Sequence, residues 1–97
     1  MQASEADIAK FLAENPSWIL KDSKLFRSFQ LPSFTQAFAF MCEVAFLAEK
    51  NNHHPEWFNV YGRVDISLTT HQFDGISSRD FELATSIDKL ASDRQAQ

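Results

Sequence analysis

The spacing of hydrophobic residues changes several times along the chain and predicts three helices and four strands. Apolar residues recur at helical spacing over residues 4–15, 34–50 and 77–91, whereas the runs 18–31 and 57–71 are short, apolar-rich and broken by polar turns. Each pair of strands is joined by a short hairpin and not by a crossover. The order α-β-β-α-β-β-α therefore predicts an α+β fold, a four-stranded antiparallel sheet with helices packed on one face.

Two of the three helices begin with the pattern of a capping box. Ser4 and Asp7, and later Ser77 and Asp80, are three residues apart, the spacing at which each side chain satisfies a free backbone N–H at a helix start. We expect the first helix to end at Asn15, because the residue before a proline avoids the helical region. This helix is expected to lie across the sheet or across one of its ends.

The longest predicted helix spans residues 34–50 and contains no Gly or Pro. Its apolar residues cover about half of the helix circumference, so this face is expected to cover the sheet. The predicted centre of that face is the stripe Phe34, Phe38, Met41, Ala45 and Ala48. Phe46 falls outside it, either as part of a subunit contact or as an aromatic tolerated at the surface. Glu49 lies at the C-terminal end of this helix, where the helix dipole disfavours a carboxylate. It is therefore expected either to be held by a nearby histidine or to be simply solvated.

The two hairpins are predicted from polar turns between the apolar runs. The first turn covers residues 21–24, and the second lies at Tyr61-Gly62, where Gly62 is expected to take a positive φ. The strand after the second turn alternates from Arg63 to His71, which predicts one apolar face toward the helices and one polar face toward solvent or a partner.

Length, charge and cysteine content narrow the class of protein. Ninety-seven residues suit one domain, 1–97, with residues 92–97 as a frayed polar tail. The net charge of −4 and the scattered basic residues argue against direct nucleic-acid binding. The sequence contains neither a signal segment nor an apolar run long enough to span a bilayer, and the lone Cys42 cannot form an internal disulfide, so we expect a cytoplasmic protein.

The titratable residues that favour chemistry are concentrated in one stretch. His53, His54 and His71 are all the histidines of the chain, and Glu49 and Asp80 flank them. Imidazoles beside carboxylates suit general acid–base catalysis near neutral pH. The alternatives are loop histidines that cap helix and strand ends, and a metal site, which the spacing disfavours because adjacent histidines rarely bind one ion together. Cys42 lacks an identifiable activating group, so it is interpreted as structural.

The stretch from His53 to Asp80 resembles the pterin-4a-carbinolamine dehydratases. The residues that carry the resemblance are His53-His54-Pro55, Tyr61, Thr70-His71 and Gly75-Ile76-Ser77 through Asp80, preceded by Ala48-Glu49-Lys50. The motif positions show no departure from the family pattern, and the looser resemblance reaches back to Trp18. It implies a similar α+β fold assembled into homodimers or homotetramers.

The resemblance also implies an activity and a set of site residues. The reaction is dehydration of 4a-hydroxytetrahydrobiopterin to the quinonoid dihydropterin, in the recycling of tetrahydrobiopterin, with no metal or organic cofactor. By resemblance, His53 and His71 transfer protons, His54 binds or orients the pterin, and Glu49 supports an imidazole. Substrate binding is assigned to Pro55, Trp57, Thr70 and Asp80, of which Pro55 and Trp57 wall the pocket.

A second class of function stays open. Relatives of this family serve as dimerisation cofactors of a transcription factor, and some related domains act in assembly. A protein partner bound on the helical face that carries Phe46 is therefore the alternative, with or without dehydratase activity.

Overall fold

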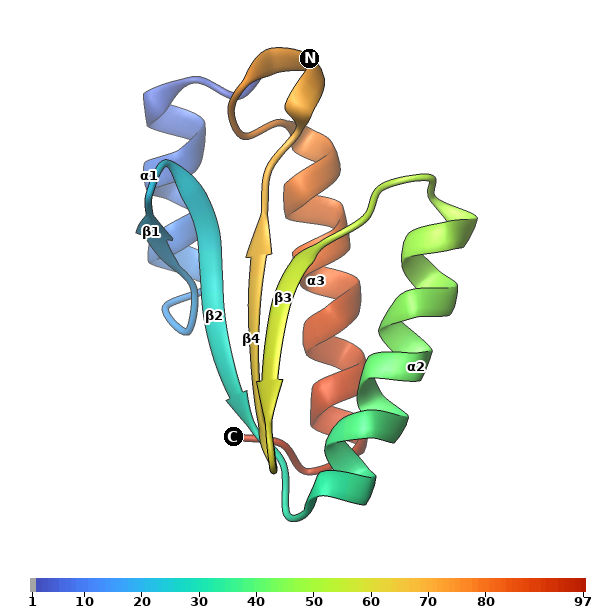
Figure 1. The fold of residues 1–97 in the computed structure, drawn as a ribbon. Helices are drawn as coiled ribbons and strands as arrows, with labels where there is room; N and C mark the ends of the chain where they lie inside the picture. The colour runs from blue at the N-terminus through green and yellow to red at the C-terminus, as the bar shows by residue number, and fades with distance from the viewer. Residues whose placement is uncertain (1) are drawn as a thin grey trace.

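The computed structural model describes residues 2–97, in which four antiparallel strands carry three α-helices on one face (Figure 1). In chain order the elements are α1 (Glu5–Glu14), β1 (Ile19–Lys21), β2 (Lys24–Gln30), α2 (Phe34–Lys50), β3 (Glu56–Val60), β4 (Arg63–Leu68), the 3-10 turn η1 (His71–Phe73) and α3 (Ser78–Asp93). The strand order across the sheet is β1-β2-β4-β3, and every neighbouring pair is antiparallel. The predicted fold class and element order are confirmed.

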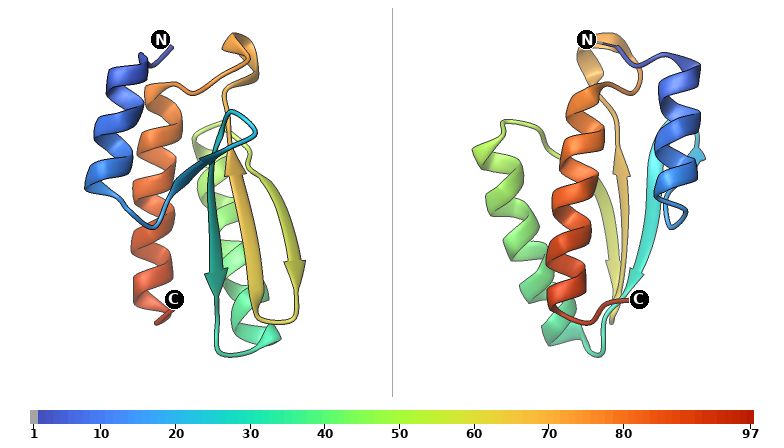
Figure 2. Two further views of the ribbon diagram at one scale, coloured as in Figure 1. Left: turned by 90° about the vertical axis from the view of Figure 1, so that its left-hand side faces the viewer. Right: turned by 180° about the vertical axis from the view of Figure 1, so that it is seen from behind.

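The helices lie side by side behind the sheet (Figure 2). Seen from behind, α3 runs between α2 and α1, and the ring of Phe11 in α1 stacks on Phe81 of α3 with 4.7 Å between the ring centroids. The first helix therefore packs along α3 and not across an end of the sheet. No helix within residues 2–97 is both long enough and apolar enough to cross a bilayer.

The core forms where the inner face of the two central strands meets the helices. Residues at alternate positions of β2 and β4 are fully buried, as the period-2 pattern predicts. They are Leu25, Phe29, Val64, Ile66 and Leu68. Arg27 lies on this inner face, and its Nη1 donates to Asp88 of α3 at 2.7 Å.

The buried stripe of α2 lies to one side of its predicted centre. The residues of α2 that are buried are Ala37, Phe40, Val44 and Ala48. Phe34, Phe38 and Ala45 were expected at the centre of the face, but they are exposed. The apolar arc of this helix is wider than the sheet beneath it, so one margin of the arc stays uncovered. Phe46 is 78% exposed, as its position outside the arc predicts.

The second hairpin differs from the prediction in which turn residue has a positive φ and in where its second strand ends. Tyr61, with φ of 51°, takes the left-handed conformation that we assigned to Gly62, whose φ is not positive. Gly62 is required for a different reason, because a Cβ there would lie 2.5 Å from the carbonyl oxygen of Leu31. Strand β4 ends at Leu68, after which Thr70 forms a single bridge with Gly75 and His71 begins the 3-10 turn.

Both predicted capping boxes are present, and the C-terminal tail is ordered. Hydrogen bonds from the backbone N–H and side chain of Ser4 hold the pKa of Asp7 below its ordinary value. The tail 92–97, which we expected to fray, continues α3 to Asp93 and then returns to the sheet. There Gln97 exchanges two backbone hydrogen bonds of 2.8 and 2.9 Å with Gln30.

Candidate active site

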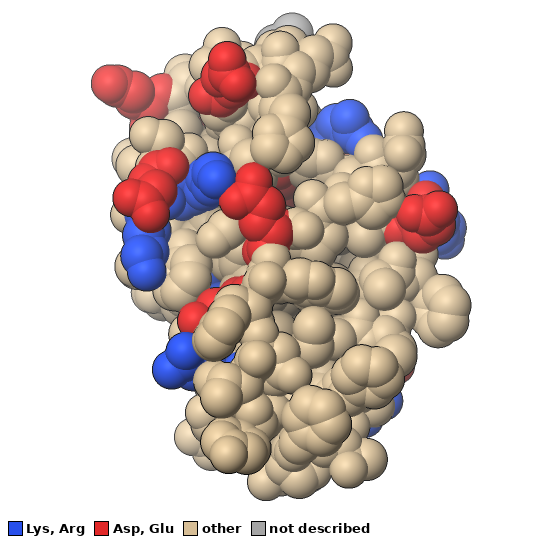
Figure 3. Space-filling model, in the orientation of Figure 1, with Lys and Arg blue, Asp and Glu red and all other residues tan. Residues whose placement is uncertain are grey.

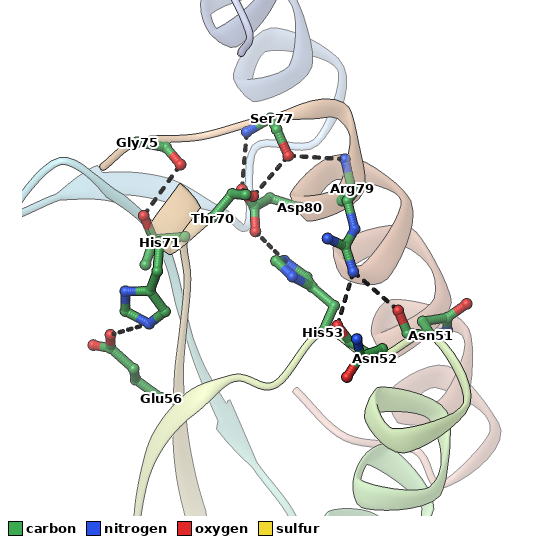
Figure 4. Close-up of polar contacts among 11 residues, drawn as sticks. Asn51, Asn52, His53, Glu56, Thr70, His71, Gly75, Ser77, Arg79 and Asp80 are labelled. Atoms are coloured by element: carbon green, nitrogen blue, oxygen red, sulfur yellow. Dashed lines mark hydrogen bonds and ion pairs between the residues drawn. The ribbon is translucent and has the colours of Figure 1, made fainter. Parts of the chain in front are cut away.

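Asp80 is the buried centre of a hydrogen-bond network at the start of α3 (Figure 4). Its side chain has no exposed surface. One carboxylate oxygen, Oδ2, accepts the backbone N–H of Ser77 at 2.9 Å and the hydroxyl of Thr70 at 2.8 Å. The other oxygen, Oδ1, lies 2.5 Å from Nε2 of His53. The N3 residue of the α3 capping box thus also holds a histidine from a different part of the chain.

The directions of these hydrogen bonds follow from the donors available. Because the Thr70 hydroxyl donates to Asp80, the Ser77 hydroxyl donates to Thr70, 2.6 Å away, and itself accepts the N–H of Arg79. Every bond in this chain is oriented toward the carboxylate, an arrangement in which each bond strengthens the next. Oδ2 of Asp80 is therefore an acceptor, and when the carboxylate is ionised its Oδ1 accepts the Nε2–H of His53.

The ring of His53 contacts Asp80 through Nε2 and keeps a small exposed area. Its Nε2 is engaged by Asp80, so Nδ1 is the nitrogen that can exchange a proton with a ligand. The residue retains 8% of its surface, on a cleft of about 250 Å³. Asn51, Arg79, Glu82, Leu83 and Ser86 line this cleft with it.

Arg79, in α3, forms hydrogen bonds to the segment that precedes His53. Its Nη2 donates to the carbonyl oxygens of Asn51 at 3.0 Å and Asn52 at 2.8 Å, just past the end of α2. These carbonyls follow the C-terminal end of α2, where the helix dipole is negative, so a guanidinium is favourable there. The contact fixes the backbone immediately before His53.

His54 points into solvent and forms a separate pair with Glu49. Its Nε2 lies 2.8 Å from Oε1 of Glu49, and both side chains are mostly exposed. Both alternatives for Glu49 thus describe part of its surroundings, because it contacts a histidine while its side chain stays 80% exposed. Adjacent histidines thus have different surroundings, one buried against Asp80 and one at the surface.

His71 lies apart from His53, on the far side of Thr70 and Asp80 in Figure 4. Its side chain is 78% exposed, and Nε2 is 3.7 Å from Oε2 of Glu56. The second oxygen of that carboxylate accepts from Nζ of Lys24 at 2.6 Å. The structure therefore does not join His71 directly to His53.

The remaining predicted residues are distributed around this site. Thr70 is buried in the Asp80 network, and Asp80 itself has no exposed surface for a ligand. Pro55 is half-buried before β3. Trp57 is 37% exposed and is paired in register with Ile66, which places it on the helix side of the edge strand β3.

Sequence reasoning missed Arg79, Glu56 and Lys24. Arg79 and Glu56 adjoin the motif residues Asp80 and Pro55, so their positions offered a signal. Lys24 offered none, because it is brought to Glu56 by the antiparallel pairing of β2, β4 and β3. Within residues 2–97, no three side chains of His, Cys, Asp or Glu converge on a point that could hold a metal ion.

Comparison with known proteins identifies the family to which this chain belongs. The family model described as "Pterin 4 alpha carbinolamine dehydratase" matches residues 1–90. The chain belongs to the pterin 4 alpha carbinolamine dehydratase family. The family is named after a dehydratase, which is a hydro-lyase, and the match over residues 1–90 extends the resemblance seen at the histidine motif to nearly the whole chain.

Individual relatives agree with the family assignment. A protein of Rhizobium meliloti (strain 1021) with the provisional name pterin-4-alpha-carbinolamine dehydratase is 45% identical over 91 residues, covering 92% of this chain and 88% of its own length. A protein of Solibacter usitatus (strain Ellin6076) with the same provisional name is 48% identical over 88 residues, covering 91% of this chain and 93% of its own length.

Two solved structures share the fold. A transcriptional coactivator/pterin dehydratase from Brucella melitensis superposes with a TM-score of 0.90 at 36% identity, over 94% of this chain and 99% of that one. A pterin dehydratase-like protein described as a RuBisCO assembly factor in the alpha-carboxysome gives a TM-score of 0.68 at 27% identity, over 77% of this chain and 89% of that one.

Proposed function

We propose that this chain dehydrates 4a-hydroxytetrahydrobiopterin to the quinonoid dihydropterin by histidine acid–base catalysis, in tetrahydrobiopterin recycling. The observation that carries the proposal is the pairing of His53 with the buried Asp80 in a member of a dehydratase family. A buried carboxylate that accepts from Nε2 holds the ring in the tautomer whose Nδ1 can accept a proton.

The reaction requires two proton transfers. The C4a–O bond breaks with its electron pair on oxygen, and an acid protonates that oxygen so that it departs as water. A base removes the proton from the ring nitrogen bonded to C4a, and the freed electron pair forms the new C=N bond. No oxidant or reductant is needed, so imidazoles suffice as acid and base.

The site residues take complementary roles in this proposal. His53 and His71 transfer the two protons, and His54, oriented by Glu49, binds the pterin. Asp80 and Thr70 position His53 instead of contacting substrate, which their burial favours. Pro55 and Trp57 form a wall against which a flat bicyclic pterin packs. We propose a cytoplasmic location, which the free thiol of Cys42 fits.

The test is turnover of freshly generated 4a-hydroxytetrahydropterin, followed by absorbance. We expect wild type to accelerate water loss, His53→Ala and His71→Ala to lose rate by about 10²- to 10⁴-fold, and a chelator to have no effect. Gln72→Ala is the matched control, because Gln72 is exposed on the same 3-10 turn as His71. A folded wild type that gives no acceleration would refute the proposal.

A second candidate function is protein binding on the outer side of α2. Phe46 and Leu47 of α2 line a groove of about 530 Å³ with Leu90 of α3. The two solved relatives are described, respectively, as a transcriptional coactivator/pterin dehydratase and as an assembly factor. We propose that this groove contacts either a further copy of the chain, in a homodimer or homotetramer, or a helix of another protein.

A further inference from the structure

We propose that Glu56, anchored by Lys24, is a positioning residue that orients His71 for proton transfer. This proposal rests on the dehydratase function proposed above. It assigns a role to two residues outside the histidine motif and explains how an exposed ring on the 3-10 turn holds a productive orientation.

The contacts join three separate segments of the chain. Glu56 begins β3, Lys24 begins β2, and His71 begins the 3-10 turn after β4. One oxygen of the Glu56 carboxylate accepts from Lys24 at 2.6 Å, and the other lies 3.7 Å from Nε2 of His71. The carboxylate therefore uses its two oxygens for two different partners.

Strand register places this carboxylate beside His71. Glu56 is opposite Ser67 of β4, and Phe26 of β2 is opposite the same residue on the other side. Side chains two residues apart share a face of a strand, so Lys24 lies on the same open face as Phe26 and Glu56. Lys24 can therefore reach across β4 to Glu56 close to the point where the chain leaves the sheet for His71.

The arrangement at His71 repeats a pattern found at the other two histidines. Nε2 of His53 faces Asp80, Nε2 of His54 faces Glu49, and Nε2 of His71 faces Glu56. All three rings thus have a carboxylate at Nε2, which leaves Nδ1 as the nitrogen available for chemistry. The first two contacts are 2.5 and 2.8 Å long. The third is longer, as catalytic contacts often are before a ligand binds.

Because the ring of His71 is exposed, it needs a contact such as that with Glu56 to hold its orientation. An exposed imidazole at the surface exchanges rotamers freely, and proton transfer requires the ring to stay within a narrow range of positions. The charged groups around His71 are Glu56 of β3, Lys24 of β2, Asp22 of the first hairpin turn and Asp74 at the end of the 3-10 turn. Of these carboxylates, Glu56 is the one within ion-pair distance of the ring, and Lys24 limits its movement.

The test is a double-mutant cycle of Glu56→Gln and His71→Ala, measured as kcat and KM. Glu56→Gln is expected to lower kcat by roughly 5- to 50-fold, with KM changed less than about twofold. In the His71→Ala background the same change should have no further effect, because Glu56 acts through the ring. Lys24→Gln should show a smaller loss of kcat. Asp65→Asn is the matched control, since it removes a carboxylate from the same sheet face.

Two kinetic outcomes would overturn the proposal: an unchanged kcat in Glu56→Gln, or an equal loss with and without His71. A second readout is independent of turnover. The side-chain ¹⁵N spectrum of His71 should show a change of tautomer and ring mobility in Glu56→Gln, while the spectrum of His54 stays the same. An inactive wild type with this spectral change would refute the dehydratase function alone, whereas an unchanged His71 spectrum would refute the role of Glu56.

Discussion

At the scale of single residues, Asp80 combines a structural and a functional task. Its carboxylate caps α3 through Ser77 and holds the imidazole of His53, and it lies entirely inside the protein. The capping role could be predicted from the spacing of Ser77 and Asp80 alone. Its contact with His53, 27 residues earlier in the chain, could not, because it depends on how α2 and α3 pack.

Asp80→Asn tests the functional task with almost no change in shape. The amide can still accept from Ser77 and Thr70 through one oxygen, but its NH₂ group then faces Nε2 of His53. That contact favours the opposite tautomer of the ring, so we expect kcat to fall by about 10²- to 10⁴-fold. The free energy of unfolding should fall by about 1–3 kcal/mol.

The control for this variant is Asp93→Asn, an exposed carboxylate at the other end of α3. Turnover is measured together with the ¹⁵N spectrum of the His53 ring. A folded Asp80→Asn protein with the wild-type rate would show that Asp80 serves only to cap the helix.

At the scale of elements, the sequence predicted the bounds of α2 and the buried face of β4, but it did not predict which side of α2 faces the sheet. The bounds of α2 and the inner face of β4 follow from hydrophobic spacing, because burial imposes that spacing on any chain. The rotation of α2 about its axis does not follow from spacing, since its apolar residues cover about half of the circumference and only part of that arc is buried. In the structure, Ala37 and Phe40 are buried, whereas Phe34 and Phe38 are exposed.

The turn at Gly62 gives a prediction at this scale. Gly62→Ala would place a Cβ 2.5 Å from the backbone oxygen of Leu31 and 2.9 Å from Nε2 of Gln30. The backbone contact cannot relax without moving the strand end, so we expect a loss of about 1–3 kcal/mol in the free energy of unfolding. Urea denaturation measures this loss.

Gly75→Ala is the matched comparison for Gly62→Ala. The nearest atom to a Cβ at Gly75 is the side-chain Nε2 of Gln2, at 3.3 Å, and that flexible side chain can move away. The cost at Gly75 should therefore be clearly smaller. Equal losses at the two glycines would contradict the role given to the contact between Gly62 and Leu31.

At the scale of the whole molecule, one side carries an uncharged surface. Charged side chains gather in the upper part of the face shown in Figure 3, whereas the lower part, over the end of the β3 and β4 hairpin and the start of α2, is largely uncharged. The exposed apolar residues include Phe34, Phe38 and Phe58. Four of the ten phenylalanines are exposed, Phe46 among them, so we expect this surface to be used in assembly.

Phe46→Glu tests the proposed contact on α2. Phe46 is 78% exposed in the isolated chain, so a charge there should not affect folding of one subunit, but it would be buried in an interface. We expect light scattering to show a smaller assembly for the variant than for wild type. Lys50→Glu, on the same helix and lining the same groove, separates the effect of charge from the loss of the aromatic ring. An unchanged mass in Phe46→Glu would contradict a subunit contact at this position.

The most direct measurement of the central claim is chemical rescue of His53→Ala during dehydration of 4a-hydroxytetrahydropterin. His53 borders a cleft, so its truncation leaves space in which free imidazole can bind. If His53 transfers a proton, the variant loses its rate and added imidazole restores part of it in a saturable way, with no such gain in wild type. A folded His53→Ala protein that keeps the wild-type rate without imidazole would contradict the account.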